Sequence, residues 1–127
     1  DVPYEVEPRF GEVDFGIFEM HSYDQLKDSL EYQAWLNGDN EANIPPQGES
    51  GEQMKKRVLK ALSEIKEDTC VITHGGVIAS IMEYIFPNEG NNRYQWQPKP
   101  GRGYAIEIGM LDKHKIHSYD VIITEKY

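Results

Sequence analysis

The stretch CVITHGG, residues 70–76, decides the fold together with the apolar segment 77–86 that follows it. Cys70–Thr73 is apolar without alternation, which is typical of a strand buried on both faces. Two glycines then allow a tight turn, and the apolar segment predicts a buried helix that ends at Pro87. Because another helix is predicted before this strand, the order of elements indicates a layered α/β domain. Cys70, inside the strand, is expected to be a buried, inert thiol.

Two capping boxes predict where the earlier helices begin. Ser22 with Gln25 starts a predicted helix that continues to about residue 36, and Ser50 with Gln53 starts the clearest helix of the chain. One face of the second helix is apolar because hydrophobic residues recur at helical spacing. These residues are Met54, Val58, Ala61, Leu62 and Ile65.

Extended segments are predicted towards both ends of the chain. Residues 2–10 alternate between apolar and polar side chains and lead into the glycine-flanked segment 11–16. Near the other end, residues 104–108 and 116–123 have the pattern of strands. Because a short polar turn joins them, they predict an antiparallel hairpin.

Composition bounds the class of protein. A length of 127 residues indicates a single domain over residues 1–127. A net charge of −9 opposes nucleic acid and anionic membranes, so neither is expected as a partner. One cysteine excludes an intrachain disulfide and a cysteine-based zinc cluster. With no signal peptide visible, a cytoplasmic location is expected.

The turn at His74-Gly75-Gly76 is the sharpest chemical signal. The free amides and the dipole of a helix that begins there would attract an anion such as phosphate. His74 could donate to a phosphoryl oxygen or transfer a proton. The structural alternative is an ordinary glycine turn beside a buried, hydrogen-bonded histidine.

Acidic and basic residues elsewhere supply further candidates. Glu12, between two glycines and two phenylalanines, could act as a general acid, although a solvated surface carboxylate is the simpler interpretation. Glu49 lies where a long loop meets a helix N-terminus, where negative charge is favourable for structural reasons alone. Arg9 could bind phosphate, or could be an ordinary surface arginine.

In series, these pieces resemble the histidine phosphatase superfamily, the branch of phosphoglycerate-mutase-like phosphatases. The resemblance rests on EVDFGIFE (residues 12–19), PQGES (46–50), the helix bearing Arg57 and VITHGGVI (71–78), and it covers residues 5 to about 86. It implies a three-layer α/β/α architecture.

The resemblance also implies roles for individual residues. Glu12 matches the acid that protonates the leaving oxygen, and His74 matches the histidine that holds the transferring phosphoryl group, with Gly75 and Gly76 beside it. Glu49 matches a position near the active site. Arg57, like Glu49, is expected to support the residues of the active site rather than to contact the substrate. No metal or organic cofactor is expected.

One motif of the family is missing. Its nucleophile is a histidine in an Arg-His-Gly triplet at the end of the first strand, and this triplet does not occur in the chain. The chain therefore resembles the C-terminal two-thirds of such a phosphatase, with an incomplete sheet that lacks two strands. Without them Cys70–Thr73 would present two bare edges. We expect these strands to come from another polypeptide segment, a swapped partner or a rearranged oligomer.

Two functions stay open at this point. One is phosphomonoester hydrolysis of a small phosphorylated metabolite through a phosphohistidine, with the chain alone inactive. The other is a non-catalytic, truncated relative that acts as a binding or oligomerising module. A phosphocarrier role for His74 is a third, weaker alternative. The loop 37–47 contains no long insertion, which favours a phosphatase over a mutase.

Overall fold

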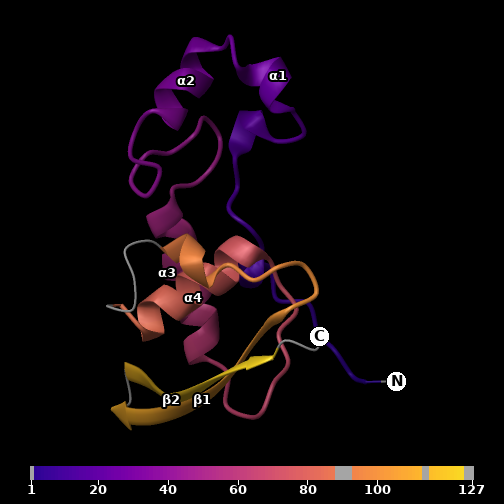
Figure 1. The fold of residues 1–127 in the computed structure, drawn as a ribbon, viewed down its shortest axis with the longest axis vertical. Coiled ribbons are helices and arrows are strands. Elements are labelled where there is room, and N and C mark those ends of the chain that lie inside the picture. The colour runs from indigo at the N-terminus through magenta and orange to yellow at the C-terminus, as the bar shows by residue number, and fades with distance from the viewer. Residues whose placement is uncertain (1, 88–92, 113–114, 125–127) are drawn as a thin grey trace. The chain divides into compact units, whose positions relative to one another are not determined.

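The computed structural model describes residues 2–87, 93–112 and 115–124, with side chains for residues 2–87 and 93–106 (Figure 1). The chain divides into two compact units. Unit 1 comprises Asp1–Glu12 and Val58–Tyr127, and unit 2 comprises Val13–Arg57. Within the described part of the chain, no helix has the length and apolar character needed to cross a membrane.

Unit 2 is built from short helices around two interlocked loops. It contains η2 (Gly16–Phe18), α1 (Tyr23–Leu26), α2 (Leu30–Leu36) and the first half of α3 (Gly51–Ser63). An aromatic cluster joins η2 to the two short helices through edge-to-face and tilted ring contacts. Its members are Phe15, Phe18, Tyr23, Tyr32 and Trp35.

The helix predicted from Ser22 to about residue 36 is two helices. The capping box of Ser22 and Gln25 is confirmed, because each side chain bonds the backbone of the other residue. The first helix ends after one turn, however, and Ser29 caps a second by accepting from the Tyr32 amide at 3.3 Å. A second serine competes for the backbone and divides the predicted helix.

The second capping box is confirmed and opens α3. The Ser50 amide donates to Gln53 Oε1 at 2.9 Å, and the Gln53 amide donates to Ser50 Oγ at 3.1 Å. The predicted apolar face is buried along the helix, while Ile65 lies beyond the helix end and is half-buried. The buried side chains are Met54, Val58, Ala61 and Leu62.

Unit 1 holds the helix predicted from the apolar segment. It contains η1 (Pro8–Phe10), the end of α3, α4 (Gly75–Ile85), η3 (Arg93–Trp96), β1 (Gly103–Asp112) and β2 (Lys115–Thr124). α4 lies against η3 and β2. The predicted hairpin is present, with β1 and β2 antiparallel and Ile106 opposite Val121 (Figure 1). Buried side chains of α4 contribute to the core: Val77, Ala79, Ser80, Ile81 and Met82.

The predicted buried strand Cys70–Thr73 is wrong for this structure. The segment is extended but belongs to no strand, and Ile72 is 95% exposed. Cys70 is exposed too, so the expectation of a buried thiol is also wrong. Residues 2–7 likewise form no strand, and the apolar side chains among them are exposed.

The reason is the extent of the sheet. Among the described residues the sheet consists of β1 and β2 alone. An apolar strand is buried only where neighbouring strands and helices cover it, and no such strands flank residues 70–73 here. The three-layer arrangement therefore stays a prediction.

Candidate functional site

The first turn of α4 presents an imidazole beside a helix N-terminus. His74 is the N-cap residue, with an extended backbone, and its carbonyl accepts from the Ile78 amide at 3.0 Å. Its ring is exposed and makes no capping bond. The structural alternative of a buried, satisfied histidine is therefore wrong. An accessible imidazole at this position can meet an anion that the helix N-terminus attracts.

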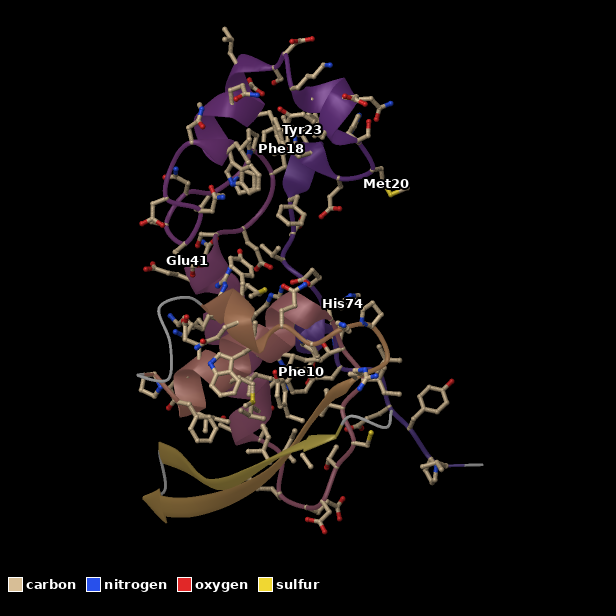
Figure 2. The ribbon with its side chains drawn as sticks, in the orientation of Figure 1. Phe10, Phe18, Met20, Tyr23, Glu41 and His74 are labelled. Carbon is tan, nitrogen blue, oxygen red and sulfur yellow. The ribbon has the colours of Figure 1, made fainter. Side chains whose placement is uncertain are left out.

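Two contacts join this turn to the end of η1 and to the segment that follows it. The Gly76 amide donates to Glu12 Oε2 at 3.2 Å, and the Thr73 hydroxyl donates to the Phe10 carbonyl at 2.5 Å. These pairs are 64 and 63 residues apart in the sequence. The fold thus brings the Glu12 carboxylate to the helix that begins directly after His74. Figure 2 labels His74 and Phe10 among the side chains of unit 1.

The two glycines provide space rather than an unusual backbone. Neither Gly75 nor Gly76 has a positive φ. A Cβ on Gly76 would lie 2.6 Å from Glu12 Oε1, and a Cβ on Gly75 would lie 2.8 Å from Gln97 Cγ. Both distances are shorter than van der Waals contact. The glycines therefore allow two side chains to approach the helix N-terminus closely.

Gln97 is a residue of this site that the sequence did not reveal. It follows η3 and reaches the start of α4, although no motif in residues 93–98 marks it. The hint in the sequence is the pair of adjacent glycines. Neither has a positive φ, and the pair leaves room for two neighbouring side chains.

Arg9 is engaged by two carboxylates. Its Nε donates to Glu7 Oε1 at 3.0 Å, and its Nη2 lies 2.6 Å from Glu64 Oε2. The bonds from Arg9 hold the pKa of Glu7 down at about 2 and lower the pKa of Glu64, while the two carboxylates raise the pKa of Arg9. A phosphate bound by Arg9 would compete with both. The phosphate-binding role of Arg9 stays a prediction.

Glu49 and Arg57 form a largely buried ion pair in unit 2. The Arg57 guanidinium makes two bonds to the Glu49 carboxylate, one from Nε to Oε2 at 3.1 Å and one from Nη2 to Oε1. The same carboxylate accepts from the Asp14 amide at 3.1 Å, and the Glu49 amide donates to the Asp14 carbonyl at 2.9 Å. The pair therefore fixes the loop that begins at Val13.

The residues of unit 1 suit an anion better than a cation. An imidazole, backbone amides and a side-chain amide gather at the start of α4, beside one carboxyl group that can exchange a proton. Within the described part of the chain, no three His, Cys, Asp or Glu side chains come close enough together to hold a metal ion. A metal-free reaction stays a prediction.

Comparisons with known proteins agree on one family. Residues 1–110 match the model of the histidine phosphatase superfamily, branch 1. The adenosylcobalamin/alpha-ribazole phosphatase of Salmonella typhimurium is 24% identical over 115 residues, which cover 85% of this chain and 56% of that protein.

A solved structure shares the fold. A solved structure from Escherichia coli K-12, named as a candidate alpha-ribazole-5'-P phosphatase, superposes with a TM-score of 0.78 at 22% identity. The superposition covers 97% of this chain and 61% of that one. The chain therefore spans little more than half the length of the proteins that it matches.

Proposed function

The chain belongs to the histidine phosphatase superfamily, and from this we propose that it forms the acid-bearing part of a phosphatase. The substrate is a small phosphomonoester, and the reaction passes through a phosphohistidine. The observation that carries this proposal is the contact of the Glu12 carboxylate with the Gly76 amide, two residues after His74, whose ring is exposed. It supports an acid and a phosphoryl-binding imidazole that serve one site.

The reaction divides into two balanced steps. A nucleophilic imidazole, outside these residues, attacks phosphorus and the bond to the ester oxygen breaks, while Glu12 gives that oxygen its proton. Water then attacks the phosphohistidine, Glu12 takes the proton back and phosphate leaves. His74 and the first amides of α4 balance the phosphoryl charge in both steps.

The substrate class follows from charge and from the relatives. A net charge of −9 opposes polyanionic macromolecules, so a small phosphorylated metabolite is the better substrate. The names of the two matched proteins place alpha-ribazole-5'-phosphate first among the compounds to try.

The exposed segment Cys70–Thr73 needs partners to become a strand. Ile72 is 95% exposed and Val71 is 37% exposed, although both have the apolar character of a sheet interior. We assign the missing neighbours to strands of a preceding chain segment or of a second copy. Sedimentation of the 127-residue chain tests this assignment, because a monodisperse, cooperatively folded monomer would contradict it.

Binding of inorganic phosphate to the isotopically labelled chain tests the site directly. We expect phosphate to shift the amide resonances of Gly75 and Gly76, and His74→Ala to abolish that shift. His21→Ala is the matched control, because this histidine is also exposed and belongs to unit 2. Phosphate that leaves both amides unmoved would overturn the proposal.

Hydrolysis of an aryl phosphate tests the chemistry. The encoding DNA upstream of Asp1 is read first, and an Arg-His-Gly triplet at the end of a strand is expected. In the extended protein, Glu12→Gln should lower kcat by about 10²–10⁴-fold, the usual contribution of a general acid. Glu5→Gln, at an exposed position in unit 1, is the control.

Two results would count against this chemistry. Robust turnover by the 127 residues alone would place the nucleophile elsewhere. A gene without the triplet would favour a non-catalytic binding module, which the absence of the triplet from these residues already makes the second candidate.

A further inference from the structure

We propose that Gln97 contacts the phosphoryl group of the substrate and donates a hydrogen bond to it from its uncharged side-chain amide, which lies at the start of α4. This proposal rests on the proposed function. It adds a residue to the site that neither the sequence motifs nor the Glu12–His74 pair includes.

The position of the Gln97 side chain is the first argument. Its Cγ, Nε2 and Cδ lie 2.8, 2.9 and 3.0 Å from the place where a Cβ of Gly75 would be. The side chain therefore lies directly over the first residue of α4, next to His74. On the following residue, Gly76, the Glu12 carboxylate lies equally close to the Cβ position. Gln97 and Glu12 thus approach successive residues of the same helical turn.

The Gln97 amide is available for a ligand. The side chain is exposed, and among the described residues its amide group makes no hydrogen bond. The His74 ring likewise has no hydrogen-bond partner in the described part of the chain. An amide carries two N–H donors, which suit a phosphoryl oxygen and add no charge beside a carboxyl group that must exchange a proton.

The backbone of Gln97 is held in place by its neighbours. The backbone N–H of Gln97 donates to the Tyr94 carbonyl at 3.1 Å. The preceding residue, Trp96, stacks on Phe86 with ring centroids 5.7 Å apart, and its carbonyl accepts from the Tyr104 hydroxyl at 2.9 Å. A side chain that contacts substrate acts best from such a fixed support, because little ordering is left to binding.

The affinity of the labelled chain for inorganic phosphate tests the proposal. A hydrogen bond to a charged acceptor such as phosphate contributes about tenfold or more in affinity, so Gln97→Ala should weaken phosphate binding by at least about that factor. Gln97→Glu should weaken it further, because a carboxylate repels the anion. Gln95→Ala and Gln95→Glu are the matched controls, since Gln95 is an exposed residue of the same short helix, and both should leave the affinity unchanged.

A double-mutant cycle tests whether Gln97→Ala weakens phosphate binding directly or only by disturbing the fold. Gly75→Ala places a Cβ against Gln97 and should weaken phosphate binding when Gln97 is present, but not in the Gln97→Ala background. An equal effect of Gly75→Ala in both backgrounds would overturn the proposal. So would a Gln97→Ala variant that binds phosphate like the wild type while His74→Ala does not, and that result would leave the proposed function standing. A wild-type chain that binds no phosphate would overturn both.

Discussion

Several described glycines leave no room for a Cβ, and two pairs of them differ in what they touch. In unit 2, a Cβ on Gly16 would lie 2.0 Å from the Pro46 carbonyl oxygen, and one on Gly48 would lie 2.4 Å from the Asp14 carbonyl oxygen. In unit 1, Gly75 and Gly76 would meet only side chains. Backbone atoms cannot move away from a new Cβ without disturbing the fold, whereas the end of a flexible side chain can move away from it.

The difference separates a structural device from a functional one. The loops of unit 2 interlock through backbone bonds, as Ile17 shows by donating to the Pro46 carbonyl at 3.0 Å. Gly16 also has a φ of +57°, which favours glycine on its own. At the start of α4, by contrast, glycine admits Glu12 and Gln97, the residues to which we assign chemistry. Substitutions should therefore cost stability in unit 2 and function in unit 1.

Gly16→Ala should have the largest effect on folding. A left-handed backbone and a clash with backbone atoms together predict a loss of about 3 kcal/mol in the free energy of unfolding. Urea unfolding measures it, followed by the fluorescence of Trp35 in unit 2 and, in a separate single-tryptophan variant, of Trp96 in unit 1. Gly101→Ala is the matched control. Its φ is +76° with nothing within 4 Å of the Cβ position, so it should lose only about 1 kcal/mol. Equal losses at both positions would refute the interlocked-loop interpretation.

Glu49→Ala should come next. It removes the carboxylate that accepts from Arg57 and from the Asp14 amide, and that carboxylate is only 17% exposed. Loss of these partly buried bonds predicts about 2 kcal/mol of destabilisation in the same Trp35 assay. Glu52→Ala, at an exposed position of α3, should change the free energy of unfolding by less than about 0.5 kcal/mol. If the two variants unfold alike, the ion pair does not fix the loop.

Gly76→Ala should leave stability within about 1 kcal/mol of the wild type. Alanine improves helix propensity, while the new Cβ displaces the Glu12 carboxylate from the helix N-terminus, and the two effects offset each other. The environment of the residue 76 amide should nevertheless change as it does in Glu12→Gln, which amide chemical shifts detect. Gly103→Ala, with open space around its Cβ position, serves as the control. A large loss of stability in Gly76→Ala would mean that this turn is structural, like the loops of unit 2.

Local signals predicted the parts of the fold that depend on neighbours in the sequence. Both capping boxes formed, and α4 begins at the glycines and ends before Pro87. Ser29 is a local signal for the break in the first predicted helix, because it caps the second helix. The capping box at Ser22 is the clearer signal, so the pattern predicts one continuous helix from there. Both caps form, and whether a second cap divides a predicted helix depends on packing, which the sequence pattern does not contain.

The remaining differences depend on contacts between distant residues. The pattern of residues 70–73 describes a strand that neighbours would bury, and it contains nothing about where those neighbours are. The approach of Gln97 to Gly75 likewise arises from the return of the chain after α4. Glu12 is predicted from its position between two glycines and from the resemblance to a family. Its contact with Gly76, 64 residues away, could not follow from spacing.

Arg9→Gln should have the smallest effect on stability, because its ion pairs are partly exposed to solvent. The folded-state pKa of Glu7 is about 2, below the usual value of 4.5, and that of Glu64 is also lowered. The contribution of Arg9 is therefore fully present above pH 4.5 and is lost as the pH falls through about 2. Urea midpoints of wild type and variant should differ slightly at pH 7 and converge near pH 2. High salt should shrink the difference at pH 7.

The same variant decides what Arg9 does for phosphate. If Arg9 only ties Glu7 to Glu64, then Arg9→Gln changes the urea midpoint and leaves phosphate affinity unchanged, and the predicted phosphate-binding role is wrong. If Arg9 binds phosphate, affinity falls in the variant. Phosphate must then compete with the two carboxylates. Glu64→Gln removes one of them, so this variant should bind phosphate more tightly than the wild type does. Weaker phosphate binding in Arg9→Gln together with tighter binding in Glu64→Gln would show that Arg9 is a cation of the anion site in unit 1. Arg57 of unit 2, by contrast, is paired with Glu49.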